Sequence, residues 1–262
     1  MRGVTRSSPG EAPHVGILCD GLTRNFGTLV AARDVSFEVR PGEVVGLLGP
    51  NGAGKTTTLR MLATLLKPTS GQGWVGGHSL LESPRKVRAV LGYLTGDTGL
   101  YGRLSPREVL VYFGLLHGMD RAQIAAQTDL LDGALGLAPF MDQRCETLST
   151  GQRQRTSIAR ALVHDPDVLI LDEPTSGLDL LAAREILTFF RAAADEGKAV
   201  LMSTHIMGEV ALICDRAAII HHGAIRTTGT LDELHAQTGA STLAQGFLTL
   251  LGEEDPTATG TP

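Results

Sequence analysis

Short runs of apolar residues alternate with longer segments of helical periodicity along much of this chain. Residues 44–48, 168–171 and 199–202 are almost continuously apolar, a pattern typical of strands that are buried on both faces of a parallel sheet. Helical patterns follow the first run at residues 58–66 and the second at residues 181–194. The chain therefore predicts an α/β fold with a parallel sheet at its centre.

Smaller strands are predicted on either side of this core. Residues 15–22 and 35–40 have strand patterns, with turn residues at 25–27 and 41–42, and they read as antiparallel strands. Residues 68–73 read as a turn, and residues 74–75 and 90–94 as further strands. Alternation at residues 217–220, with Gly223 at a turn, predicts a closing hairpin.

A different pattern begins after Asp97. Ser105, Pro106 and Glu108 form a helix start, with a cap, a proline at the first position and an acid three residues after the cap. Residues 105–137 are expected to be helical, and their apolar segment 109–116 is either helix core or a surface for a partner. We expect a helical insert at about 98–160 within one domain spanning 15–252, a flexible leader at 1–14 and a disordered tail at 253–262.

Composition narrows the class of protein. The chain has 262 residues, 42% hydrophobic and 19% charged, and its net charge is −5 with both signs interspersed, so no nucleic-acid partner is expected. Its three cysteines are far apart, which favours a reduced compartment. Since no apolar run approaches the roughly 18 residues that cross a bilayer, any membrane-spanning part would belong to another chain.

A glycine-rich loop follows the first apolar run. It consists of Gly49, Pro50, Asn51, Gly52, Ala53, Gly54, Lys55, Thr56 and Thr57. Its glycines let several backbone N–H groups point inward, and the following helix adds a positive dipole end, so polyphosphate is the expected ligand. Lys55 would reach the β- and γ-phosphates, and the Thr56 hydroxyl would bind Mg²⁺. The alternative is an ordinary glycine-rich turn.

Two acids end the second apolar run, at Asp172 and Glu173. If the strands of the two runs are neighbours, Asp172 would face the glycine loop and hold Mg²⁺ with Thr56. Glu173 could orient and deprotonate an attacking water. In the alternative, the two acids only cap the strand before the turn at Pro174.

A second helix start lies at residues 146–162. Ser149 is placed as the N-cap of a helix that runs from about Gly151, so free N–H groups gather near a hydroxyl and a glycine. These residues predict either a second anion site or simply a well-capped helix.

The order of these motifs resembles that of the ABC ATPase family over residues 15–252. Residues 49–57 are similar to the Walker A motif, 148–152 to the signature motif and 168–173 to Walker B with its catalytic glutamate. Residues 176–179 resemble the D-loop, and His205 is in the place of the switch histidine. The resemblance implies a P-loop NTPase (RecA-like) parallel sheet with a small antiparallel β subdomain and a helical insert subdomain.

The resemblance also implies roles for particular residues. Two such domains would form a head-to-tail dimer around two ATP molecules, with Ser149 and Gly151 contacting the γ-phosphate held by the partner. Gln152 would belong to the same nucleotide-binding motif. Asp179 would communicate across the interface, and His205 would help to position the water, unless it is only a polar residue at a strand end. Phe26 would stack on adenine, or else be an ordinary turn aromatic.

One position departs from the family pattern. Gly96 stands where the family usually has a glutamine that touches Mg²⁺ and water, and Asp97 follows it. Asp97 would then substitute as a metal-shell ligand, or the contact would be missing. This stretch resembles that of bacterial sodium-extruding and related exporter ATPases.

The resemblance therefore implies an ATP-hydrolysing subunit of an exporter, peripheral on the cytoplasmic face of the membrane. Its partners would be a separate polytopic permease and a second ATPase subunit, with ATP and Mg²⁺ as cofactors. A soluble clamp in translation or DNA repair, or an importer subunit, is the alternative. The transported substrate does not follow from this chain, because in this family the permease selects it.

Overall fold

The computed structural model describes residues 15–96, 99–239, 245–247 and 249. The leader and tail expected at 1–14 and 253–262, and Asp97, lie outside these residues. The strands are β1 (Ile17–Phe26), β2 (Leu29–Val39), β3 (Val44–Leu48), β4 (Ser70–Val75), β5 (His78–Ser79), β6 (Leu91–Leu94), β7 (Val168–Asp172), β8 (Ala199–Thr204), β9 (Arg216–His221) and β10 (Ala224–Thr230). The helices are α1 (Lys55–Leu62), α2 (Pro84–Val90), α3 (Pro106–Leu116), α4 (Arg121–Leu135), α5 (Thr150–Leu162), α6 (Leu180–Asp195), α7 (Met207–Ile213) and α8 (Leu231–Thr238), with 3₁₀ turns at Ala138–Phe140 and Cys145–Thr147.

The central sheet has the strand order β10-β9-β3-β8-β7-β6. Its strands run parallel from β9 to β6, and β10 adds an antiparallel edge. A second, antiparallel sheet has the order β2-β1-β4-β5. The expected parallel core, the antiparallel N-terminal strands and the closing hairpin are thus confirmed.

Alternate residues of the central strands enter two different hydrophobic cores. Val45 and Leu47 of β3, with Ile170 of β7, face α1 and the antiparallel sheet. Leu48 and Leu171, next to them in the chain, face the opposite side, where α6 and α7 pack. Because both faces are covered, the strands are apolar at nearly every position.

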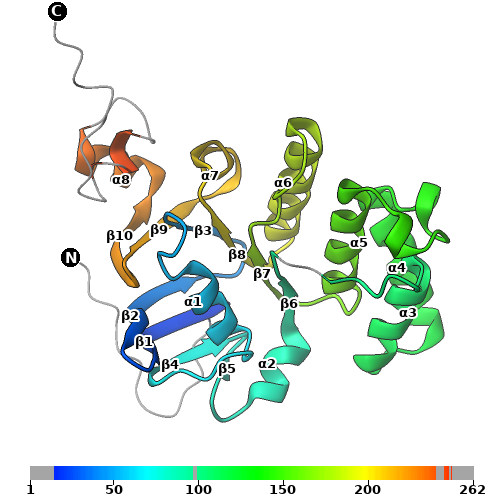
Figure 1. Ribbon diagram of the computed structural model, residues 1–262, viewed down its shortest axis with the longest axis horizontal. Coiled ribbons are helices and arrows are strands. Elements are labelled where there is room, and N and C mark those ends of the chain that lie inside the picture. The colour runs from blue at the N-terminus through cyan, green and yellow to red at the C-terminus, as the bar shows by residue number, and fades with distance from the viewer. Residues whose placement is uncertain (1–14, 97–98, 240–244, 248, 250–262) are drawn as a thin grey trace, which may run out of the picture.

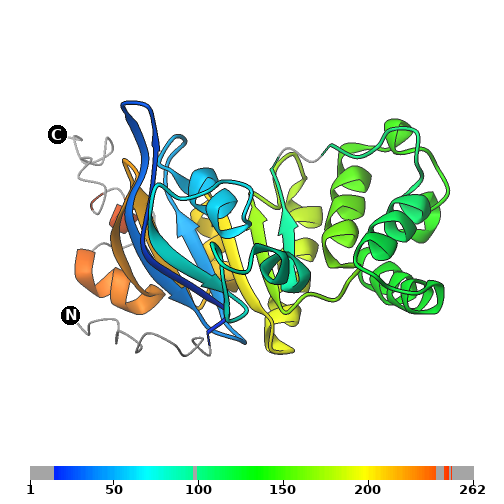
Figure 2. The ribbon, with the colours of Figure 1, turned by 90° about the horizontal axis from the view of Figure 1, so that it is seen from below.

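Helices α3, α4 and α5 form a lobe beside the sheet edge at β6 and β7 (Figure 1). Seen from below, this lobe extends to one side of the two sheets (Figure 2). The lobe lies in the segment where an insert is expected. In segment 109–116, Val109 and Leu110 are buried, as helix core requires, while Leu116 is exposed.

Several local predictions were wrong. Helix α1 ends at Leu62, and Thr64 has a φ of 57°, so the helix does not continue to residue 66. Residues 70–73 belong to β4 because they pair with β1, although three glycine or serine residues in this stretch resemble a turn. Helices α2, α7 and α8 were not expected.

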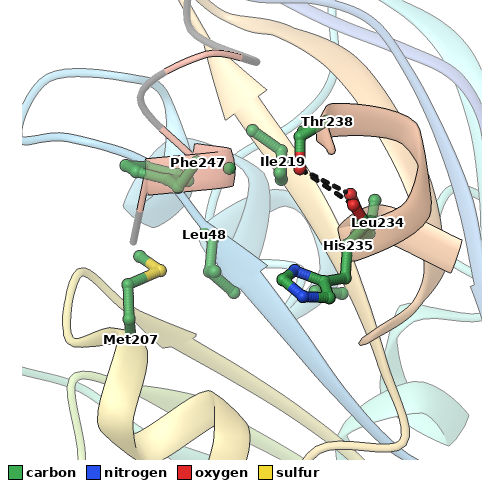
Figure 3. Close-up of a pocket in the computed structure, with 9 residues that line it drawn as sticks. Leu48, Met207, Ile219, Leu234, His235, Thr238 and Phe247 are labelled. Atoms are coloured by element: carbon green, nitrogen blue, oxygen red, sulfur yellow. Dashed lines mark hydrogen bonds between the residues drawn. The ribbon is translucent and has the colours of Figure 1, made fainter. Parts of the chain in front are cut away.

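A small apolar cavity lies between α8, β9 and the end of β3 (Figure 3). Its volume is about 10 Å³, room for about one water molecule, and its lining includes Leu48, Met207, Ile219 and Phe247. Thr238 closes the last turn of α8 by donating to the carbonyl of His235 at 3.1 Å. The described lining is apolar apart from His235 and Thr238, so we regard the cavity as a packing feature.

No helix within the described ranges has both the length and the apolar character needed to cross a bilayer.

Candidate nucleotide site

The glycine-rich loop connects β3 to α1, as the strand, loop, helix order predicts. Gly54 directly precedes the first helical residue. Its φ is 104°, a backbone conformation that residues with a side chain rarely adopt. A Cβ at Gly54 would lie 2.6 Å from the carbonyl oxygen of Ala31, and one at Gly49 would lie 2.3 Å from that of Ile220. The loop therefore needs glycine at these positions, because neighbouring backbone from β2 and β9 packs directly against it.

Lys55 is buried beneath this loop. Its ammonium donates to the carbonyl oxygens of Gly49 at 2.6 Å and Pro50 at 3.2 Å. Burial lowers the pKa of Lys55, while the nearby carboxylates of Glu173 and Asp172 oppose this shift. A cation held under inward-facing N–H groups is suited to binding a polyphosphate chain.

Asp172 reaches the site in a different way from the one expected. Strand β8 separates β3 from β7, so the condition that the two strands are neighbours is not met. Ser203 of β8 pairs with Asp172 in the parallel register and donates from Oγ to its Oδ1 at 2.5 Å. The carboxylate is buried and oriented by this hydroxyl, which no local sequence signal indicated.

Glu173 lies between the side chains of Lys55 and His205. Its Oε1 lies 4.0 Å from Lys55 Nζ and 3.2 Å from His205 Nδ1. Its N–H donates to the Oγ of Ser203 at 3.1 Å, and its φ is 49°, in the left-handed region. Such backbone costs about 1–3 kcal/mol and is retained at sites where the surrounding contacts enforce it.

A pocket of about 340 Å³ opens over the glycine loop. Besides residues 50–57 and Glu173, it is lined by Leu29, Val30 and Ala31 of β2 and by His222 and Gly223 of the β9–β10 turn. The N–H of Gly223 donates to the carbonyl oxygen of Ala53 at 2.9 Å, so this turn is fixed to the loop. His222 was not among the expected site residues, because it lies far along the chain and in no motif.

Phe26 ends β1 beside this pocket. It pairs with Leu29, which lines the pocket, and its side chain is 46% exposed. The guanidinium of Arg24 lies 4.6 Å from the ring centroid. An exposed aromatic ring next to a phosphate pocket is available to stack on a base.

The signature residues form a second, separate feature. Ser149 caps α5 in a capping box with Gln152, in which each side chain accepts from the other's N–H. The neighbouring turn carries Asp179, which caps α6, and Gly151 lies against Leu178 of that turn. None of these residues lines the described part of the phosphate pocket, so the two features lie apart within one chain.

Gly96 lies beside Asp172. A Cβ at this position would be 3.4 Å from the carbonyl oxygen of Asp172, which is ordinary van der Waals contact. The structure thus has room for a side chain where this chain has glycine.

Together, the glycine loop, its buried lysine and the Asp172–Glu173 pair define a P-loop nucleoside triphosphatase. The protein-family model described as ABC transporter matches residues 32–176, and a second model, for an AAA domain, matches residues 144–211. The ABC transporter ATP-binding protein NatA of Bacillus subtilis is 42% identical over 222 residues, which cover 84% of this chain and 90% of NatA. The daunorubicin/doxorubicin resistance ATP-binding protein DrrA of Streptomyces peucetius is 39% identical over 236 residues, which cover 88% of this chain and 70% of DrrA.

Solved structures agree with this class. The structure of an ATP-binding subunit of an ABC transporter aligns with a TM-score of 0.83 at 29% identity, over 89% of this chain and 98% of that one. The chain belongs to the ABC transporter family, as its ATP-binding subunit. ABC ATP-binding subunits are ATPases that dimerise and work with a membrane permease, so the resemblance in fold and activity is confirmed.

Proposed function

We propose that this chain hydrolyses ATP with Glu173 as general base and drives export through a separate permease from the cytoplasmic face of the membrane. The observation that carries the proposal is the position of the Glu173 carboxylate, in contact with His205 and 4.0 Å from Lys55. Lys55 binds the phosphates, and His205, with its proton on Nδ1, holds the carboxylate toward the attacking water. The relative DrrA, whose name refers to daunorubicin/doxorubicin resistance, supports export over import.

Mg²⁺ fits the donors near the glycine loop. It binds hydroxyl, carboxylate and water oxygens, and Thr56 and Asp172 supply the first two. The Asp172 carboxylate is held by Ser203 through Oδ1, which leaves Oδ2 for a metal-bound water. The ion would neutralise phosphate charge during transfer.

The two separate half-sites favour a head-to-tail dimer. Ser149 is exposed at the start of α5 with the free N–H groups of a helix N-terminus, and the phosphate pocket lies elsewhere on the same chain. In a second copy, Ser149, Gly151 and Gln152 would contact the γ-phosphate, Asp179 would lie at the interface, and Phe26 would stack on adenine.

A groove between the sheet edge and the helical lobe suits a permease. It has a volume of about 690 Å³ and is lined by apolar side chains, among them Leu65 and Leu116, which are 62% and 63% exposed. Arg85, Arg88 and Arg160 also line it, and no carboxylate of the described residues does. An apolar segment with an acidic residue complements this lining.

The test of catalysis is the Glu173→Gln variant. It keeps the side-chain volume but removes the base, so kcat should fall about 100-fold or more while ATP binding persists. ATP-bound dimer should then accumulate in size-exclusion chromatography with light scattering. Glu196→Gln, at an exposed helix end, is the matched control. ATPase activity of Glu173→Gln equal to wild type would show that the base is wrong.

Two further measurements address binding and the partner. Lys55→Ala should abolish ATP binding, because the pocket loses its only buried cation among the described residues; retained binding would contradict its role.

Co-purification should recover a polytopic membrane protein, and recovery of ribosomes or DNA instead would favour the soluble clamp.

A further inference from the structure

A buried carboxylate lies behind the catalytic site, in helix α7. Glu209 is 7% exposed, and both of its oxygens accept hydrogen bonds from threonine hydroxyls. Oε1 accepts a short hydrogen bond from Oγ1 of Thr175, and Oε2 accepts one from Oγ1 of Thr204 at 2.5 Å. Burying a carboxylate is costly even when its oxygens are paired, and an apolar side chain would fill this position at lower cost. Packing alone therefore does not account for Glu209.

The two threonines belong to different segments, and each lies next to a site residue. Thr175 is two residues after Glu173, in the turn that follows β7. Thr204 ends β8 and directly precedes His205. The Glu209 carboxylate therefore joins the backbone segment that carries the proposed base to the segment that carries its histidine partner.

Each segment is also held by other contacts. The Thr204 hydroxyl accepts from the N–H of Ile206 at 3.0 Å, which shapes the chain on the far side of His205. On the other side of the Glu173 turn, Gln154 of α5 donates to the carbonyl oxygen of Pro174 at 2.5 Å. The left-handed backbone of Glu173 is thus enforced from two helices, α5 and α7.

We propose that Glu209 is a positioning residue for ATP hydrolysis, which sets the distance between Glu173 and His205 through Thr175 and Thr204. The inference rests on the proposed role of Glu173 as the base. Glu209 does not touch nucleotide, so its removal should misplace the base without weakening ATP binding.

The first test compares two substitutions at one position. Thr175→Val keeps the shape but removes the donor to Glu209, whereas Thr175→Ser keeps the hydroxyl. We expect kcat to fall roughly 10- to 100-fold in Thr175→Val and in Glu209→Met, with the KM for ATP unchanged and activity retained in Thr175→Ser. Thr188→Val, at an exposed hydroxyl of α6 bonded within its own helix, is the control.

The second test separates positioning from general destabilisation. In a Glu173→Gln background the base is gone, so adding Thr175→Val should not lower the residual rate further. An equal loss in both backgrounds, a rise in KM in place of the fall in kcat, or wild-type kcat in folded Thr175→Val would each overturn the inference. Wild-type activity in Glu173→Gln alone would instead refute the base, and the inference with it.

Discussion

Buried polar side chains gather around Glu173. Lys55, Asp172, Ser203 and Glu209 are all buried, and each contacts a segment that carries the site. Elsewhere in the described cores, aliphatic residues dominate. Departures of this kind from apolar packing are expected where function requires them.

His164 is a half-buried histidine away from this cluster. It follows α5, stacks on His117 at the end of α3 with ring centroids 3.6 Å apart, and interacts through Nε2 with the carbonyl oxygen of Leu91 at 3.2 Å. Burial, with a smaller contribution from His117, lowers the pKa of His164 to about 4. The unfolded chain therefore binds a proton at His164 more readily than the native protein does.

This difference predicts a loss of stability in acid. As pH falls from 7 to 5, His164 becomes protonated in the unfolded chain but stays neutral in the native protein. This residue should therefore lower the free energy of unfolding by about 2 kcal/mol. Most of the drop comes below pH 6.5. Urea unfolding of wild type and His164→Gln at both pH values measures it. If the free energy of unfolding changed equally with pH in the two proteins, His164 would not be its source. A measurement at pH 8, where His164 is neutral in both the folded and the unfolded state, gives the reference value.

The same type of N-terminal cap begins several helices of this chain. Helices α3, α4, α5 and α8 each begin with a capping box, in which the cap side chain and the side chain three residues later satisfy each other's N–H. In α3 the box only begins the helix, whereas in α5 the same box lies in the signature motif.

Ser149→Ala and Ser105→Ala therefore form a matched pair. Each should lower the free energy of unfolding by about 1 kcal/mol, because one helical N–H loses its acceptor. Only Ser149→Ala should also lower ATPase activity, by at least about tenfold, since its hydroxyl is proposed to contact phosphate. Urea unfolding and steady-state ATPase assays measure the two effects. A similar activity loss in both variants would assign Ser149 a role in helix stability alone.

The molecule as a whole has an exposed apolar surface where α6 begins. Leu180 and Leu181 are 85% and 73% exposed, directly after Asp179 and beside the turn that touches Gly151. We predict that these exposed side chains contact the second copy in the proposed dimer.

Leu180→Glu should therefore prevent the ATP-dependent dimer. In the Glu173→Gln background, a charge at this contact would remain unpaired on closure, while the monomer should keep its melting temperature because the side chain is exposed. Light scattering with ATP distinguishes dimer from monomer. Leu130→Glu, at a position 68% exposed on α4, should still dimerise; if both variants dimerise, the contact lies elsewhere.

Features encoded within a few neighbouring residues followed from the sequence alone. The glycine loop, the continuously apolar strands and the caps at Ser105 and Ser149 depend on local backbone geometry and on periodicity. The ABC resemblance came from the order of such motifs. The β4 residues 70–73 were missed for the converse reason, because pairing with β1 outweighed their local turn preference.

Contacts between distant segments were decided only by the tertiary structure. The insertion of β8 between β3 and β7 brings Ser203 to Asp172, and α7 brings Glu209 to Thr175 and Thr204. Strand order depends on how whole layers bury their apolar faces, and no motif records it. The sequence thus determined which residues could perform the chemistry, and the packing of the sheet decided what holds them in place.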